Sequence, residues 1–147
     1  MAITGVDHTA IVVSDLARSL AFYCDIVGLE LGWQVDDDGH ELARMVGYEQ
    51  AMLRMAELRL PGGHRLELIE YVRPRGRTQA PERCDVGAAH ICLRVDDVTA
   101  EVNRLKEAGV DTFVSDPVEF TDGPDAGSRV VYVCDPDGII LELYEPH

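Results

Sequence analysis

VDHTAIVVSDLARSLAFY, residues 6–23, returns in altered form as AAHICLRVDDVTAEVNRL, residues 88–105. His8 aligns with His90 at an offset of 82 positions, and the same offset aligns acidic and apolar positions along both stretches. Each stretch begins with a β-rich run and continues with apolar residues at helical spacing. The internal repeat predicts two similar modules, each opening with a strand and a helix.

A second repeated stretch closes each half of the chain. RLELIEYV at residues 65–72 resembles ILELYEPH at residues 140–147, and Glu67 aligns with Glu142 at an offset of 75 positions. Two further β-rich runs precede each closing stretch, so the order βαβββ is predicted twice. These additional strands are expected at residues 29–35, 51–60, 110–115 and 128–134.

Both predicted helices carry start and stop signals. Side chains suited to N-capping precede them, and glycines that suit a left-handed stop follow them. The signals are Ser14 or Asp15 and Gly28 in the first half, and Asp96 or Asp97 and Gly109 in the second.

The segment between the halves is rich in proline, glycine and arginine. We therefore expect one domain, with module one at about residues 4–73, a linker at about 74–86 and module two at about 87–147. The fold class is predicted as α+β, with two tandem βαβββ modules whose strands form a curved mixed sheet around a cleft.

Strand alternation places the repeated polar residues on one side of the sheet. Leu66 and Leu68 flank Glu67 and point to the face that must pack on the helices. Ala89, Ile91 and Leu93, which alternate with His90 along its strand, point to the same face. His8, Glu67, His90 and Glu142 are thus predicted on the face away from the helices.

Two imidazoles and two carboxylates at equivalent positions are most simply explained by a metal ion, because a buried carboxylate is costly unless it is paired or coordinated. His8, Glu67, His90 and Glu142 are the predicted ligands of one divalent ion. Their nitrogen and oxygen donors suit Zn, Ni, Co, Mn or Fe and do not choose among them. The alternative is that each residue is merely hydrogen-bonded or solvent-facing. Glu70 and Glu145 also match each other and are expected to be exposed.

Charge and composition exclude several classes of function. The formal net charge is −14, and the only basic cluster is RPRGR at residues 73–77, so we expect no nucleic-acid partner. No apolar run is long enough for a membrane helix, and no basic segment precedes the first apolar stretch, so we expect no membrane partner and a cytoplasmic location. The four cysteines form no CxxC pair and are expected to be reduced and mostly buried.

The chain resembles the vicinal oxygen chelate superfamily, which includes glyoxalase I, methylmalonyl-CoA epimerase, extradiol dioxygenases and fosfomycin and bleomycin resistance proteins. The motifs that carry the resemblance span almost the whole chain: DHTAIVVSDLARSLAFYCDIVGLEL (7–31), LELIEY (66–71), AHICLRVDDV (89–98) and DPDGIILELYEP (135–146). The stretches at residues 57–77 and 123–138 also resemble cyclitol epimerases of aminocyclitol biosynthesis. The resemblance implies a divalent metal held by a His, Glu, His, Glu set as in glyoxalase. Methylmalonyl-CoA epimerases carry Gln where this chain has Glu67.

We expect a metal-dependent isomerase or lyase of the glyoxalase or epimerase type, acting on a small α-hydroxycarbonyl-like substrate. Glu67 and Glu142 are the predicted catalytic residues, which remove and return a proton beside the carbonyl. No residues are predicted to bind an organic cofactor. An Fe(II) extradiol dioxygenase and a non-enzymatic antibiotic-binding protein are the alternatives, and the resemblance implies a homodimer. Residues considered for the substrate pocket are Trp33, Met45, Tyr48, Met52, Arg54, Met55, Tyr71 and Tyr144.

Overall fold

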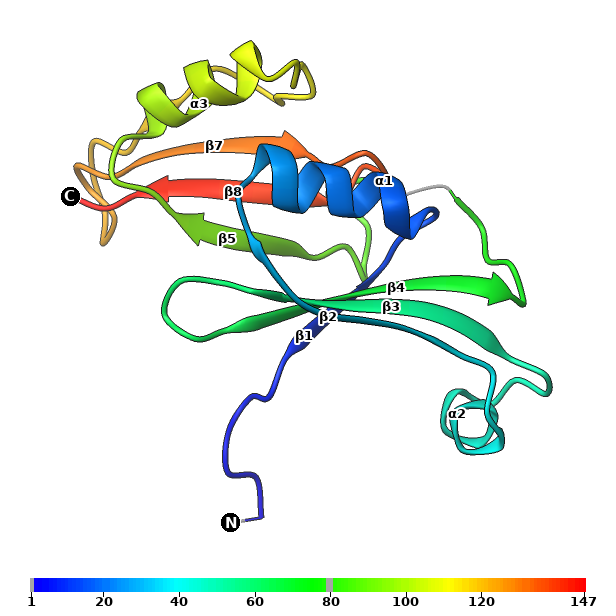
Figure 1. Ribbon diagram of the computed structural model, residues 1–147. Coiled ribbons are helices and arrows are strands. Elements are labelled where there is room, and N and C mark those ends of the chain that lie inside the picture. Colours follow the sequence, from blue (N-terminus) through cyan, green and yellow to red (C-terminus); the bar gives the residue numbers. More distant parts are fainter. Residues whose placement is uncertain (1, 79–80) are drawn as a thin grey trace. The chain divides into compact units, whose positions relative to one another are not determined.

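The computed structural model describes residues 2–78 and 81–147 and divides into two compact units, Met1–Thr78 and Gln79–His147 (Figure 1). Each unit contains a four-stranded mixed sheet, with a helix between its first two strands in the sequence. The predicted α+β class and the two tandem βαβββ modules are confirmed. The predicted linker, residues 74–86, includes residues 79 and 80, which lie outside the described residues.

The sheet of the first unit has the strand order β1-β4-β3-β2. Strands β1 and β4 are parallel, and the other pairs are antiparallel. Its elements are β1 (Thr9–Val12), α1 (Leu16–Leu20), the π-helical continuation η1 (Ala21–Ile26), β2 (Glu30–Asp37), α2 (His40–Val46), β3 (Met52–Arg59) and β4 (Arg65–Arg73).

The second unit repeats this topology with the strand order β5-β8-β7-β6. Strands β5 and β8 are parallel, as β1 and β4 are in the first unit. Its elements are β5 (His90–Arg94), α3 (Val98–Glu107), β6 (Val118–Glu119), β7 (Arg129–Cys134) and β8 (Ile140–Glu145).

The helix boundaries follow the signals in the sequence. The Asp15 carboxylate accepts a hydrogen bond from the Arg18 backbone N–H at the start of α1, and Asp97 accepts from Ala100 at the start of α3, both at 2.9 Å. Gly28 has φ +93° after η1, a left-handed conformation that favours glycine. The same capping chemistry therefore starts the main helix of both modules.

Each sheet buries its leucine side. Leu66 and Leu68 of β4 are at most 2% exposed, and Leu141 and Leu143 of β8 are also buried. They pack with the apolar stripes of α1 and α3, which include Leu16 and Val102. Because neighbouring residues of a strand point to opposite faces, Glu67 and Glu142 lie on the sides away from these helices, as predicted.

Helix α2 lies between the predicted strands at residues 29–35 and 51–60, where the sequence patterns predicted no helix. Leu42 of α2 is buried with Ala51 and Leu53, and Met55 and Ile69 pack against this cluster. Met55 and Ile69 are partners on neighbouring strands, on the same face as Glu67. Helix α2 therefore covers part of the face that carries Glu67, and module two has no matching helix among its described residues.

The predicted strand at residues 110–115 is wrong in position. Phe113 forms only an isolated bridge with Val133 of β7, and the regular ladder begins later, at β6. Pro117 follows two polar residues and lacks a backbone N–H, which interrupts regular pairing between these segments.

A tight turn at residues 135–138 sets the start of β8. The buried carboxylate of Asp135 accepts hydrogen bonds from the backbone N–H groups of Asp137 and Ile139, both at 2.8 Å. Gly138 has φ +84°, which completes the turn. The predicted turn is thus present, and it fixes which residues of β8 face the helix.

The expectation of mostly buried cysteines is wrong. All four cysteines are free, but Cys84 and Cys92 are exposed, and Cys24 and Cys134 are half-buried. Cys92 is exposed because strand alternation places it on the face of β5 that carries His90 and that points away from α3. Among the described residues, no helix combines the length and the apolar character that a membrane crossing requires.

Candidate metal centre

Strand register brings His8 and Glu67 together in the first unit. Glu67 of β4 is the partner of Ala10 on β1, and His8 precedes Ala10 by two residues, on the same face. The Nε2 atom of His8 lies 3.4 Å from Oε2 of Glu67. Glu67 is largely enclosed, with 17% of its side chain exposed, whereas 43% of His8 is exposed.

The second unit contains the equivalent pair. Glu142 of β8 is the partner of Cys92 on β5, and His90 precedes Cys92 by two residues. Nε2 of His90 lies 3.0 Å from Oε2 of Glu142, and the two side chains are 44% and 18% exposed. The two pairs match in register, atoms and exposure, so the repeat in the sequence is also a repeat of local geometry.

The surroundings of the first pair are ionic. Glu57 is buried on β3 directly opposite Glu67. Arg65 donates a hydrogen bond to the Glu57 carboxylate at 3.0 Å. Arg65 also donates to Asp7, whose other carboxylate oxygen lies 2.9 Å from Nδ1 of His8. The hydrogen bond from His8 and the charge of Arg65 hold the pKa of Asp7 below its usual value.

The surroundings of the second pair are aromatic and thiol-bearing. Tyr132 is opposite Glu142 on β7, and its ring centroid lies 5.5 Å from that of His90. Burial raises the pKa of the Cys92 thiol, and the adjacent Glu142 carboxylate, which accepts its hydrogen bond, raises it further. The sequence patterns identified neither Tyr132 nor Cys92 as part of the site, because the strand register that brings both opposite Glu142 has no local signature in the sequence.

The donor atoms of the two pairs fit a divalent transition metal. Each pair offers one imidazole nitrogen and one carboxylate oxygen, which are donors that Zn, Ni, Co, Mn and Fe(II) accept. In residues 2–78 and 81–147, no three His, Cys, Asp or Glu side chains are grouped so as to hold an ion. Within each unit, the candidate donors are therefore one imidazole nitrogen and one carboxylate oxygen.

Comparison with known proteins places this chain and its fold in one family. Residues 5–143 match the sequence profile described as the Glyoxalase/Bleomycin resistance protein/Dioxygenase superfamily. The chain belongs to this superfamily. Its members share the fold but not one reaction, so individual relatives are more informative about chemistry.

Named relatives of this superfamily member include enzymes. The chain is 37% identical to a 2-epi-5-epi-valiolone epimerase of Actinomyces sp. over 141 residues, which cover 94% of this chain and 77% of the epimerase. It is 29% identical to a probable lactoylglutathione lyase of Vibrio parahaemolyticus, covering 94% of this chain and 88% of the lyase. An uncharacterized protein of Escherichia coli is 34% identical over 95% of both chains.

Solved structures of the superfamily agree on the fold. A glyoxalase family protein of Bacillus cereus superposes with a TM-score of 0.82 over 99% of this chain and 98% of that chain, at 24% identity. Glyoxalase I of Leishmania major, at 26% identity, gives a TM-score of 0.64 over 97% and 87% of the two chains.

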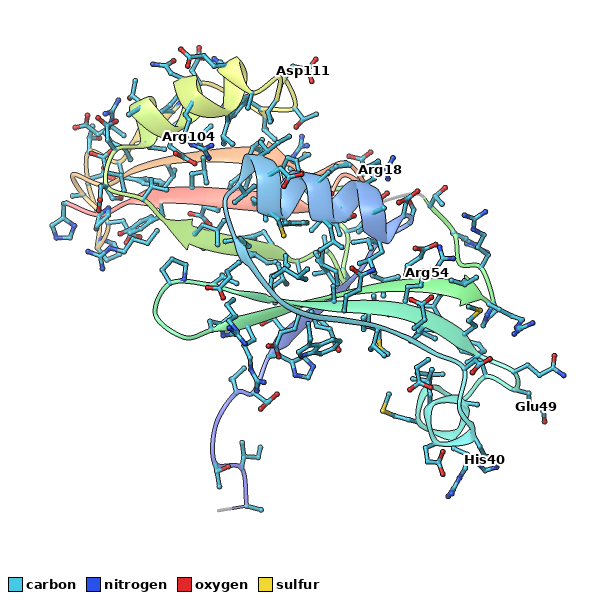
Figure 2. The ribbon with its side chains drawn as sticks, in the orientation of Figure 1. Arg18, His40, Glu49, Arg54, Arg104 and Asp111 are labelled. Carbon is cyan, nitrogen blue, oxygen red and sulfur yellow. The ribbon has the colours of Figure 1, made fainter. Side chains whose placement is uncertain are left out.

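Of the residues considered for a substrate pocket, those on the first sheet divide between its two faces. Met45 lies on α2, Tyr48 follows α2, and Tyr144 lies on β8 of the second unit. Trp33, Met55 and Tyr71 lie on the same face as Glu67 according to the register. Arg54 lies on the opposite face (Figure 2). Its Nη1 atom lies 3.7 Å from Oε1 of Glu70. Arg54 therefore belongs to the helix side of the sheet and is excluded from the face that carries Glu67.

The expectation that Glu70 and Glu145 are exposed is wrong. Glu70 is buried and accepts a hydrogen bond from the Leu16 N–H at 3.0 Å, and Glu145 accepts from the Val98 N–H at 2.8 Å. Both carboxylates thus bind a free N–H in the first turn of a helix, which is a favourable place for negative charge. Their match in the sequence reflects this helix contact.

Proposed function

We propose that this chain is a metal-dependent isomerase or lyase that moves a proton at the carbon beside a carbonyl of a small α-hydroxycarbonyl-like substrate. The observation that carries the proposal is the matched His–Glu pair in both modules, with Nε2 to Oε2 distances of 3.4 and 3.0 Å. A single such pair is common as a hydrogen bond. Two pairs at equivalent positions support a metal ion that both pairs bind.

One divalent ion of the group Zn, Ni, Co, Mn and Fe is the proposed cofactor, with His8, Glu67, His90 and Glu142 as its ligands. When bound, such an ion polarises a chelated carbonyl and acidifies the adjacent C–H. The ligand set is complete only with the pairs of both modules, so we expect about one ion per chain.

Glu67 and Glu142 are the proposed proton carriers. A carboxylate that is largely enclosed, as both are, is a good general base when it lies within hydrogen-bond reach of the substrate. Because the two carboxylates are equivalent in the repeat, one can take the proton from one face of the substrate carbon and the other can return it to the opposite face. This division of labour suits epimerisation.

Epimerisation is also favoured by the relatives. The identity of 37% to the valiolone epimerase exceeds the 29% to the Vibrio parahaemolyticus lyase and the 30% to a Salmonella typhimurium lactoylglutathione lyase. The name of the epimerase gives 2-epi-5-epi-valiolone as its substrate. Cyclitol ketones are therefore the first substrates to assay. Hemithioacetals and 2-methyl-branched acyl thioesters follow.

The deciding experiment measures metal content and proton exchange on the same preparation. Protein purified without chelator should contain or take up about one divalent ion per chain. With a substrate in D₂O, deuterium should enter the carbon beside the carbonyl, and a chelator should stop this exchange. Protein that binds no metal contradicts the proposal, and so does activity that requires catechols and O₂, which indicates a dioxygenase.

We also propose that the protein is a cytoplasmic homodimer, as the family resemblance implies. Sedimentation velocity measures the assembly directly, and a species with the mass of one chain contradicts it. Fractionation of the source cells measures the location.

A further inference from the structure

The imidazole of His8 is contacted at both ring nitrogens. Nδ1 lies 2.9 Å from Oδ1 of Asp7, and Nε2 lies 3.4 Å from Oε2 of Glu67. An ionised carboxylate can only accept hydrogen bonds, so the shorter contact requires a proton on Nδ1. In the neutral imidazole this leaves the lone pair on Nε2, the nitrogen that faces Glu67.

Asp7 is itself held in place. One of its carboxylate oxygens accepts from His8, and the other accepts from the guanidinium of Arg65. A second guanidinium nitrogen of Arg65 donates to the buried Glu57 at 3.0 Å, and Glu57 is the cross-strand partner of Glu67. Hydrogen bonds and ion pairs therefore link Glu57, Arg65, Asp7, His8 and Glu67, in that order, in one chain of contacts.

The second module lacks this chain of contacts. At the offsets of the repeat, Ala89 occupies the position of Asp7, Ile140 that of Arg65 and Tyr132 that of Glu57. Nε2 of His90 lies 3.0 Å from Glu142, and the ring of His90 lies against the ring of Tyr132. Nothing in the described part of the chain hydrogen-bonds to Nδ1 of His90.

We propose that Asp7 is a positioning residue that fixes the orientation and the tautomer of His8, and that Arg65 and Glu57 hold Asp7 in place for this task. His8 is then a preorganised ligand that presents Nε2, and within the described residues His90 is oriented only by Glu142 and Tyr132. The inference rests on the proposed function, since it assigns His8 as a ligand. A carboxylate behind a metal-binding imidazole fixes the ring and increases its basicity.

The first test needs no metal and no substrate. Two-bond ¹⁵N–¹H NMR spectra of the metal-free protein report the tautomer of each imidazole, at about pH 9, where an ordinary histidine is neutral. The His8→Gln variant assigns the signal of His8. We expect the Nδ1–H tautomer for His8 and the Nε2–H tautomer for His90. Native protein in which His8 carries its proton on Nε2 overturns the proposal.

Three variants separate orientation from charge. Asp7→Ala removes the acceptor and should shift His8 to the Nε2–H tautomer, whereas Asp7→Asn keeps an acceptor oxygen and should restore Nδ1–H. Asp38 is an exposed aspartate outside this chain of contacts. Asp38→Ala removes the same charge and should leave the tautomer of His8 unchanged. If His8 keeps its tautomer in Asp7→Ala, Asp7 does not position it.

The second test measures Co²⁺ affinity by competition with a chelator, using the visible spectrum of the bound ion. Asp7→Ala should bind Co²⁺ about 10- to 100-fold more weakly than the native protein, the usual effect of removing such a partner. Asp7→Asn should recover part of the loss, and Asp38→Ala should match the native affinity. Equal affinities of Asp7→Ala and native protein overturn the positioning role. Native protein that shows the expected tautomers but binds no Co²⁺ overturns the proposed function instead.

Discussion

Glu67 and Glu142 occupy equivalent positions but have different neighbours. Glu67 faces the carboxylate of Glu57 across the strand pair, and Glu142 faces the phenol of Tyr132. Glu57 is paired with the Arg65 guanidinium, so Glu67 lies in an ionic environment, whereas the Tyr132 phenol and the Cys92 thiol beside Glu142 are neutral hydrogen-bonding groups. The two proposed proton carriers thus work in unequal environments, which is useful when one removes a proton and the other delivers it.

Replacing either carboxylate by glutamine should affect chemistry more than folding. Glu67→Gln and Glu142→Gln keep the size and one oxygen ligand but cannot accept the proton, so kcat should fall about 100-fold or more. Deuterium exchange in D₂O should become slow or restricted to one face of the substrate carbon. The exposed Glu49→Gln on the loop after α2 is the control and should keep native kcat. Full exchange in both variants would remove these carboxylates from the mechanism.

The sequence alone was informative about these residues because the strand period is two. Once Leu66 and Leu68 were placed on the helix side, Glu67 had to face away, and the structure has it there. The neighbours were harder to find. Glu57, Arg65 and Tyr132 come from adjacent strands, and their positions depend on a register that no local pattern specifies.

At the scale of elements, the same three-residue arrangement starts the main helix of each module. Asp15 and Glu70 accept from N–H groups of α1, and Arg54 lies 3.7 Å from Glu70. In module two, Asp97 and Glu145 bind the start of α3, and Arg129 lies 3.8 Å from Glu145. A carboxylate from the last strand of each sheet thus accepts a hydrogen bond from the first turn of the helix and connects the helix to the sheet.

Removing the carboxylate of Glu70 or Glu145 should lower the free energy of unfolding, most strongly for Glu70 in module one. Glu70→Ala leaves the buried N–H of Leu16 without its acceptor, so the free energy of unfolding should fall by about 1–3 kcal/mol, the usual cost of losing a charged hydrogen-bonding partner. Glu145→Ala should cost less, because Glu145 is 24% exposed and water can replace it. Urea unfolding measures both, with Glu49→Ala as the control. Unfolding midpoints equal to the control would show that these carboxylates do not hold the helices.

Helix α2 shows where prediction of elements from the sequence failed. HELARMV carries only two large apolar residues toward the core cluster, too few for a clear helical period, and the flanking aspartates and glycines are typical of loops. The helix forms because Leu42 is buried against Leu53 on the sheet. Tertiary packing of this kind leaves little trace in a single sequence.

At the scale of the whole molecule, a shared ion would join the stabilities of the two modules. Each module supplies one imidazole–carboxylate pair, so an ion held by all four groups is released when either module unfolds. Binding to the folded state alone stabilises it by about 2.7 kcal/mol at a metal concentration 100 times the Kd.

Co²⁺ at that concentration should therefore raise the Tm by about 5–10 °C, given about 2–4 °C per kcal/mol for a chain of this size. A chelator should reverse the increase. His8→Ala and His90→Ala should lose it even though each change lies in a different module. His64→Ala, which removes an exposed histidine bonded to Thr9, is the control and should keep the increase. A shift that persists in both histidine variants would place the ion elsewhere.

The turn at residues 135–138 has a consequence for how this chain tolerates insertions and deletions. Its Asp135 hydrogen bonds fix the residue at which β8 begins. One extra residue between Gly138 and Ile140 would turn Glu142 toward the helix and bring a leucine to the face that carries His90. A single insertion at this turn should thus remove Glu142 from the proposed ligand set without changing any side chain of the site, whereas an insertion in the loop at residues 121–126 lies between β6 and β7 and leaves the register of β8 unchanged. Homologues that keep the function should differ in length at that loop and remain constant at this turn.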